Sequence, residues 1–240
     1  MLFRSEVIVA NSTPPALAAK SATNTIPIVF FANNPVESGL VWSLALPGAN
    51  LTGLSTVNTD FAGKRVEILK DLFPAARHAA VLWNRLNNGS TLAFQGMELA
   101  SGRIGLELKD FGISSRRELN GAITSAVQAG AAAVLAIDDP VIQSYQDEIV
   151  ALATKSALPI LSQYPEFARG GGLLSYGPNL AAIYRRGAVY VDRILKGAKP
   201  SDMPIEQPTQ FNLVINMRTA KTLGINVPGI VFARADEVIE

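Results

Sequence analysis

The sequence has no cysteine and a single histidine, His78, among its 240 residues. Without cysteine the chain can form no disulfide, perform no thiol catalysis and bind no metal through thiolates, and one histidine excludes a multi-histidine metal centre. No run approaches the ~18 apolar residues that a membrane-spanning helix needs. An excess of one charge is also missing, because 21 basic and 20 acidic residues leave a net charge of +1. A nucleic acid is therefore not expected as a partner.

Motifs for common cofactors are missing as well. The chain has no G-x-G-x-x-G after a predicted strand, no phosphate-binding loop, no H-E-x-x-H and no calcium loop, and it lacks the G-x-S-x-G turn of hydrolases. We therefore expect no cofactor and no metal. Hydrophobic residues make up 48% of the chain and charged residues 17%, which is enough apolar material for a folded core.

Short apolar runs rich in β-branched residues alternate with longer segments of helical character. Each run is almost continuously apolar, which is typical of strands covered on both faces in a parallel sheet. The sequence therefore predicts an α/β fold. The predicted strands are residues 7–10, 26–31, 79–83, 132–137, 158–161 and 172–176, and the predicted helices are 14–22, 63–73, 90–104, 116–129, 140–156 and 179–196.

Some local expectations are more specific. Val141, Tyr145, Ile149 and Leu152 recur at helical spacing, which predicts one continuous helix over 140–156. Asp139 precedes Pro140, a pairing of cap residue and first-turn proline that marks the beginning of a helix. Residues 48–53 are expected to form a turn-rich loop. Trp42 and Trp83 are expected in the core, and His78 at the surface.

Polar residues follow the predicted strands. Ligands of open parallel sheets bind beyond the carboxyl ends of the strands, so these residues are the candidate binding site. Amides, hydroxyls and two tyrosines with one carboxylate suit hydrogen-bonded recognition of a small polar molecule better than they suit catalysis. The candidates are Ser12, Thr13, Asn33, Asn34, Asn84, Asp138, Tyr164 and Tyr176.

Each candidate also has a simpler interpretation. Ser12 and Thr13, before Pro14, either cap a helix or also bind an anion such as a carboxylate. Asp138 either pairs with a ligand ammonium group or is solvated, and Asp139 either caps a helix or contacts ligand. The tyrosines either stack on a ligand or are half-buried structural residues. A catalytic acid–base pair is the least favoured alternative, because adjacent carboxylates on one loop usually diverge.

Several motifs point to a known family. The C-terminal stretch reads PIEQPTQFNLVIN over 204–216, then TAKTLG over 219–224, and the chain ends ARADEVIE. Further matches are IPIVF at 26–30, PGANLTG at 47–53, GLLSYGP at 172–178 and YVDRILKG at 190–197. The sequence resembles, over essentially its whole length, the ABC transporter substrate-binding protein family that includes tryptophan- and tyrosine-binding members.

This resemblance implies a type I periplasmic-binding-protein fold of two doubly wound lobes joined by a hinge, with a small ligand between them. It implies that lobe one comprises residues 6–75 and 179–197, and that lobe two comprises 78–173 and 204–240. Hinge crossings are then expected near Pro74, Tyr176 and Pro200. Ser12 and Thr13 would hold the carboxylate of an amino acid and Asp138 its ammonium group. Closure around the ligand would be recognised by the partner, an ABC permease in the membrane.

The resemblance also bears on localisation. It implies a periplasmic or cell-surface protein, whereas the sequence begins without a signal-peptide pattern. Family members have two β-α units before the strand that matches residues 6–10. We therefore expect an N-terminally truncated member with an incomplete first lobe. Two other functions stay open: a ligand-sensing effector domain of a regulator with the same fold and, less favoured, an α/β enzyme that uses Asp138 or Asp139 as a base.

Overall fold

The computed structural model describes residues 5–57, 59–137 and 139–240. The chain forms two compact units, each assembled from three segments. Unit 1 comprises Met1–Asn58, Asn87–Leu92 and Pro178–Gln210, and unit 2 comprises Thr59–Leu86, Ala93–Gly177 and Phe211–Glu240. Both contain a sheet with parallel strands flanked by helices, which confirms the predicted α/β fold class.

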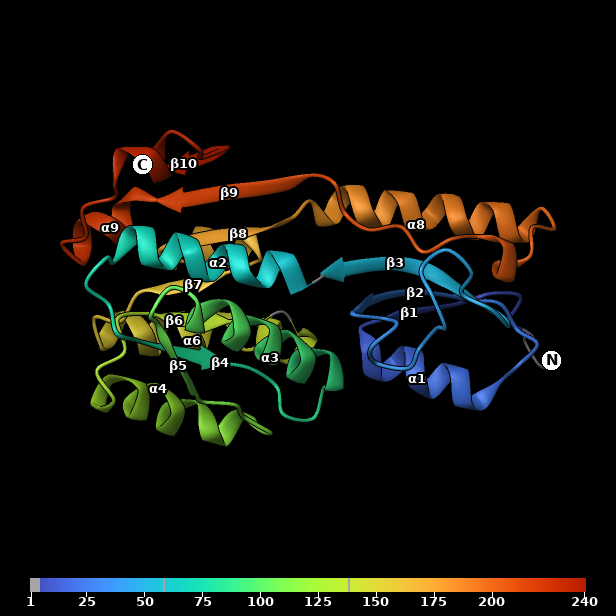
Figure 1. Cartoon of the computed structure of the whole chain (residues 1–240), viewed down its shortest axis with the longest axis horizontal. Helices are drawn as coiled ribbons and strands as arrows, with labels where there is room; N and C mark the ends of the chain where they lie inside the picture. Colours follow the sequence, from blue (N-terminus) through green and yellow to red (C-terminus); the bar gives the residue numbers. More distant parts are fainter. Residues whose placement is uncertain (1–4, 58, 138) are drawn as a thin grey trace. The chain divides into compact units, whose positions relative to one another are not determined.

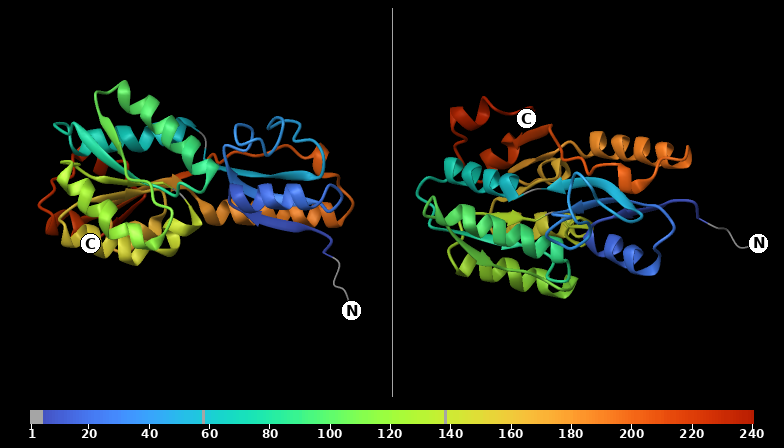
Figure 2. Two further views of the ribbon diagram at one scale, coloured as in Figure 1. Left: turned by 90° about the horizontal axis from the view of Figure 1, so that it is seen from below. Right: turned by 45° about the vertical axis from the view of Figure 1, so that its right-hand side comes forward.

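The sheet of unit 1 has three parallel strands in the order β1-β2-β3. Helix α1 covers one face and helix α8 covers the other (Figures 1 and 2). A short 3₁₀ turn, η2, contacts β3. The bounds are β1 Ile8–Asn11, α1 Thr13–Ala22, β2 Ile28–Asn33, β3 Leu51–Val57, α8 Leu180–Leu195 and η2 Pro200–Asp202.

The position of β2 at the centre of the sheet accounts for its apolar sequence. All six of its residues are buried, because a helix lies over each face of the sheet. Phe30 packs with the cluster beneath α1, whereas the next residue, Phe31, packs with Ile183 of α8. On α8, Gly187 faces Phe31 so closely that an added Cβ would lie 2.3 Å from Cζ of that ring. A glycine is therefore needed where α8 meets β2.

The sheet of unit 2 has seven strands in the order β10-β9-β8-β7-β6-β4-β5. The pairs β10–β9, β8–β7, β7–β6, β6–β4 and β4–β5 are parallel. The strand bounds are β4 His78–Leu82, β5 Glu107–Asp110, β6 Val134–Ala136, β7 Ile160–Ser162, β8 Leu174–Pro178, β9 Phe211–Asn216 and β10 Glu237–Ile239.

Helices cover both faces of this sheet (Figure 1). The largest core cluster joins buried side chains of α2, α3, α9 and α10 to the strands, and α4, α6 and α7 bury their own apolar residues elsewhere on the sheet. The helix bounds are α2 Thr59–Leu72, α3 Asn88–Gly102, η1 Arg116–Glu118, α4 Leu119–Gln128, α5 Pro140–Ser144, α6 Gln146–Lys155, α7 Pro165–Arg169, α9 Met217–Thr222 and α10 Gly229–Phe232.

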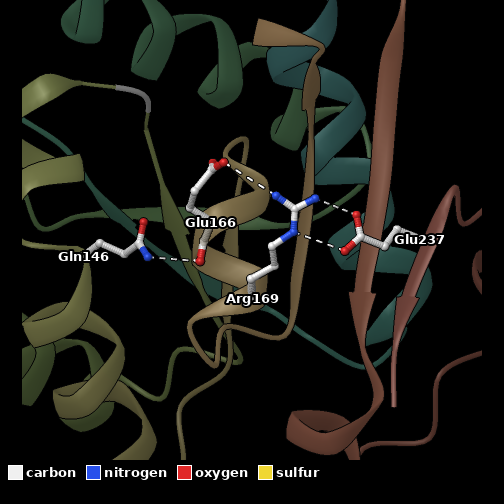
Figure 3. A network of polar contacts seen from close by, with 4 residues as sticks. All are labelled: Gln146, Glu166, Arg169 and Glu237. Carbon is white, nitrogen blue, oxygen red and sulfur yellow. Dashed lines mark hydrogen bonds and ion pairs between the residues drawn. The ribbon is translucent and has the colours of Figure 1, made fainter. Parts of the chain in front are cut away.

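An ion-pair network fixes α7 within unit 2 (Figure 3). The Arg169 guanidinium makes two bonds to the Glu237 carboxylate of β10, at 3.1 and 2.7 Å, and Glu166 lies 3.7 Å away. From α6, Gln146 donates to the Glu166 carbonyl at 3.0 Å. The hydrogen bond from Arg169 is the main reason why the pKa of Glu237 is lowered. Helix α7 is therefore connected to both α6 and the edge strand β10.

Three local predictions were wrong. Residues 51–53 of the predicted loop begin strand β3, which pairs with β2 along its length. The predicted helix over 140–156 breaks at Tyr145, which has a non-helical φ of −103° and ψ of 10°, and it forms α5 and α6 instead. Trp42 is 82% exposed rather than in the core, whereas Trp83 is buried as predicted.

The two units do not coincide with the two lobes inferred from the family resemblance. Helix α2 lies in unit 2, whereas a boundary near Pro74 groups it with the first lobe. Residues 204–210 and the short segment Asn87–Leu92 lie in unit 1. The assignment of functional lobes stays a prediction.

Candidate functional site

The three parallel strands of unit 1 bring four of the predicted residues to one edge. Ser12 and Thr13 follow β1, and Asn33 and Asn34 lie at the end of β2. Thr13 is buried, and its hydroxyl donates to the Asn33 carbonyl at 3.3 Å. Oδ1 of Asn33 accepts a hydrogen bond from Thr56 at the end of β3. All three strand ends therefore share one polar network.

Asn34 carries an unused donor at this edge. Its side chain is 4% exposed, and no acceptor among the described residues bonds to its Nδ2. The backbone has a positive φ of 45°, a region that asparagine tolerates better than most residues. A buried amide donor without a partner is costly in a folded protein, so such a group needs an explanation. Contact with a polar ligand supplies one.

The start of α1 offers an anion fewer backbone donors than a typical helix. Pro14 and Pro15 have no amide hydrogen, so Thr13 brings the only N–H among the first three helical residues. Because the Thr13 hydroxyl already donates to the Asn33 carbonyl, an anion held at this edge would depend on the Thr13 amide and the Ser12 hydroxyl. Ser12 itself has a φ of 83°, which is a strained conformation for a residue with a Cβ.

A second polar edge lies within unit 2, where β7, β6 and β4 are neighbours. Asn84, beyond β4, donates from Nδ2 to both carboxylate oxygens of Asp139 at 3.1 Å. Asp139 is 2% exposed and accepts from the amides of Val141 and Ile142 at 2.7 and 3.3 Å. The interpretation of Asp139 as the cap of a helix starting at Pro140 is thus confirmed. Asn84 orients that carboxylate.

The end of β7 adds Gln163 and Tyr164. Tyr164 is buried and precedes α7, and its amide donates to the Ser162 hydroxyl at 3.2 Å. Gln163 is 3% exposed, and its Nε2 has no hydrogen-bond partner among the described residues. Unit 2 therefore resembles unit 1 in one respect, since each polar edge has a buried amide donor that no described acceptor satisfies.

One predicted residue lies within a strand rather than beyond its end. Tyr176 lies inside β8, where its half-buried ring stacks on Phe211 with a centroid distance of 5.9 Å and packs against the main core. These contacts leave the ring half-buried, and its contact with a ligand stays a prediction. Asp138 lies outside the described residues.

Sequence reasoning missed several polar residues at these edges. Gln163 follows the predicted strand 158–161 and directly precedes the candidate Tyr164, but no feature of the local sequence marked it as a binding residue. Thr56 was missed because no strand was predicted over residues 54–57, which continue β3 beyond the predicted loop of residues 48–53. Buried Arg65 of α2 donates to the Ala136 carbonyl at 3.3 Å, a contact across 71 residues that no local pattern could reveal.

His78 and Asn84 lie at opposite ends of β4. His78 begins the strand, whereas Asn84 follows its last residue, Leu82. The imidazole lies 3.0 Å from Glu107 of β5.

Among the described residues, no three histidine or acidic side chains are grouped so that they could hold a metal ion. Nor is any helix in that part of the chain long and apolar enough to cross a membrane.

A cavity of about 250 Å³ lies elsewhere in unit 1, between α8 and the segment 206–210. Arg186 and Glu206 line it and form a two-bond ion pair of 2.8 and 2.6 Å with each other. The bond to Arg186 is the first cause of the lowered pKa of Glu206. Of the predicted ligand residues that the structure describes, none lines this cavity.

A family model described as "ABC transporter substrate binding protein" matches residues 3–239. The tyrosine-binding protein of Clostridioides difficile (strain R20291) is 30% identical, in an alignment that covers 98% of this chain and 68% of that protein. The chain belongs to this family.

Solved structures agree with this assignment. An ABC domain from Streptococcus pneumoniae in complex with L-Trp superposes with a TM-score of 0.92 at 27% identity, covering 98% of this chain and 81% of that one. The ligand-free, open structure of a Clostridium difficile substrate-binding protein with adhesive properties has a TM-score of 0.67 at 29% identity, covering 98% and 78%. The chain thus has the type I periplasmic-binding-protein fold that the resemblance implied.

Proposed function

We propose that this substrate-binding protein binds an aromatic amino acid, L-tryptophan or L-tyrosine, and passes it unaltered to an ABC importer. The observation that carries the proposal is the pair of buried amide donors, Asn34 Nδ2 and Gln163 Nε2, at the carboxyl ends of parallel strands. Two similar proteins, a tyrosine-binding protein and an ABC domain in complex with L-Trp, support the aromatic class.

Each end of an amino acid finds suitable chemistry in the candidate residues. Ser12 would donate its hydroxyl hydrogen to the carboxylate, and Thr13, whose hydroxyl hydrogen is bonded to the Asn33 carbonyl, would donate its backbone amide. Asn33, Asn34 and Asn84 would add amide contacts, and Asp138 would pair with the ammonium group. Tyr164 and Tyr176 would supply aromatic surface for the ligand ring. These roles form part of the proposal.

Binding without turnover is the simplest use of such a site. Asp139 is already engaged by Asn84 and two backbone amides, so its lone pairs are poorly placed to take a proton from a substrate. Incubation with L-tryptophan followed by mass spectrometry is expected to return the amino acid unchanged. An ABC permease is the proposed partner, and the periplasm or the cell surface the proposed location.

A thermal-shift panel tests the ligand class. L-tryptophan or L-tyrosine at 100 times its Kd should stabilise the protein by about 2.7 kcal/mol, which raises Tm by several degrees. Stabilisation by a sugar or a purine, with none by any amino acid, would refute the proposal.

A matched pair of variants tests the site. Gln163→Ala should weaken binding roughly tenfold through loss of one amide contact. Gln143→Ala removes the same group from an exposed position on α5 and should bind as the wild type does. Equal affinities of these two variants would remove Gln163 from the site.

A further inference from the structure

The first turn of helix α3, with Asn87 directly before it, lies against the beginning of α1, and no strand-end pattern selected it. The segment Asn87–Leu92 belongs to unit 1, although the chain on both sides of it belongs to unit 2. Asn87 is 1% exposed, and its Nδ2 donates to the Ser12 hydroxyl oxygen at 3.1 Å. Its Oδ1 accepts from the Gly89 amide at 2.9 Å, which closes the turn. Asn87 therefore fixes the turn and contacts Ser12 with a single amide.

Gly89 allows this turn to approach α1 closely. A Cβ at this position would lie 2.6 Å from Oγ1 of Thr13 and 3.3 Å from its Cβ. Both distances are shorter than normal van der Waals contacts, so any larger residue would push the turn away from Thr13. The turn thus contacts both hydroxyl residues of the candidate site.

The hydrogen bond from Asn87 determines what the Ser12 hydroxyl can do. A hydroxyl has one hydrogen to donate, and here its oxygen already accepts from an amide. That acceptance directs the hydroxyl hydrogen toward a different acceptor, and a hydroxyl that accepts a bond donates a stronger one. Pro14 and Pro15 remove backbone donors from the same helix start, which makes this hydroxyl hydrogen more important for an anion.

We propose that Asn87 is a positioning residue for ligand binding, which holds Ser12 Oγ as a hydrogen-bond donor to the carboxylate of the ligand, while Gly89 keeps the turn in contact with Thr13. This inference rests on the proposed function, because it needs a ligand that carries a carboxylate. Asn87 acts through Ser12 and need not touch the ligand.

A double-mutant cycle tests this coupling by calorimetry with L-tryptophan and L-tyrosine. Ser12→Ala and Asn87→Ala should each weaken binding roughly tenfold. The double variant should bind no more weakly than Ser12→Ala alone, because Asn87 then has no hydroxyl to orient. Effects that multiply fully in the double variant would overturn the inference.

The pH dependence of ligand affinity in Asn87→Asp distinguishes a positioning role of Asn87 from a purely structural one. In Asn87→Asp the carboxylate would accept the Ser12 hydrogen and repel the ligand carboxylate, so binding at pH 7 should fall further than in Asn87→Ala. Near pH 4 the introduced carboxyl becomes protonated, and part of the affinity should return. An affinity for Asn87→Asp that does not depend on pH would contradict the proposal.

Two glycines of α3 provide a matched steric test. Gly89→Ala should weaken binding, whereas Gly102→Ala at the other end of the helix meets nothing within 4 Å and should bind normally. If Asn87→Ala does not fold, Asn87→Ser keeps an acceptor for the Gly89 amide but does not reach Ser12, and the same loss is expected. Wild-type binding with unchanged Asn87 and Gly89 variants would overturn this inference alone, whereas no binding by the wild type would overturn the proposed function as well.

Discussion

At the scale of single residues, the polar side chains within each strand-end edge form hydrogen bonds with one another. Thr56 donates to Asn33, and Asn84 donates to Asp139. These bonds hold the side chains in one orientation before any ligand arrives, which reduces the entropy that binding must overcome. Asn34 and Gln163 retain buried amide donors. Each polar edge is therefore held in one orientation and keeps one buried amide donor without a described acceptor.

Tyr190 provides a test of buried polar chemistry in unit 1. Its hydroxyl donates to the Pro204 carbonyl at 2.6 Å, and burial, followed by the nearby Glu206 carboxylate, raises the pKa of Tyr190 to about 12. The folded state holds this proton more tightly than the unfolded state, whose tyrosine pKa is about 10. The stabilisation is therefore complete below pH 10 and is lost as the pH rises toward 12.

Urea denaturation of the wild type and of Tyr190→Phe should show this difference. Their gap in unfolding free energy should shrink by about 2–3 kcal/mol between pH 9 and pH 12. Other groups that titrate in this range are present in both proteins and largely cancel. A gap that is constant over this range would mean that Tyr190 titrates normally.

Local chemistry made some residues predictable from sequence and left others hidden. Asp139 could be interpreted as a cap because an Asp-Pro pair is in itself a local signal for the beginning of a helix. Trp42 was assigned to the core because of its residue type, but it lies on an exposed loop with its ring against Gly48. Asn87 was missed because its contact with Ser12 spans 75 residues and leaves no local pattern.

At the scale of elements, the packing of α8 on β2 depends on one glycine. Gly187→Ala places a Cβ 2.3 Å from the Phe31 ring, so the helix or the ring must move. We expect a loss of about 1–3 kcal/mol in unfolding free energy, the usual cost of overpacking. In Gly121→Ala of α4 the new methyl meets nothing within 4 Å, and that variant should gain up to about 1 kcal/mol from helix propensity. Equal stabilities of the two variants in urea would contradict the packing described.

The link between α7 and β10 should respond to the loss of its cation. Arg169→Gln should raise the pKa of Glu237 toward its ordinary value of 4.5. A lowered carboxyl pKa stabilises the fold above the unfolded value, and this contribution is lost as the pH falls through the folded value. Because the pair is half-exposed, we expect less than about 1 kcal/mol.

Titration of the Glu237 carboxyl by NMR measures this directly. Arg116→Gln, which breaks another exposed ion pair of unit 2, serves as the control and should leave Glu237 unchanged. An unshifted Glu237 in Arg169→Gln would show that the ion pair does not form in solution.

Strands that are buried on both faces could be predicted from the sequence, whereas strand β3 and the break between α5 and α6 could not. Strands β2 and β4 are continuous apolar runs, so their sequence alone reveals them. Strand β3 reads LTGLSTV, and its threonines, serine and glycine resemble a loop until pairing with β2 is known. The predicted helix over 140–156 failed because apolar spacing continues through Tyr145, where the backbone does not.

At the scale of the whole molecule, the fold class and the family could be predicted from the sequence, but the chain segments that make up each unit could not. Three separate segments make up each unit, including six residues, Asn87–Leu92, that leave unit 2 and return. This division of the chain depends on contacts between residues that are distant in sequence, so no local sequence pattern reveals it. The polar edges at the strand ends were predictable because parallel strands bring their carboxyl ends together.

The proposed function requires that a carboxylate-bearing aromatic solute binds at these strand ends. Isothermal titration calorimetry of the wild-type protein with L-tryptophan and L-tyrosine tests it most directly, with indole as the matched ligand that lacks both the carboxylate and the ammonium group. We predict saturable binding of one molecule per chain for at least one amino acid, and at least 100-fold weaker binding of indole, since two charge-assisted contacts are lost. No heat with either amino acid, or equal affinity for indole, would contradict the account.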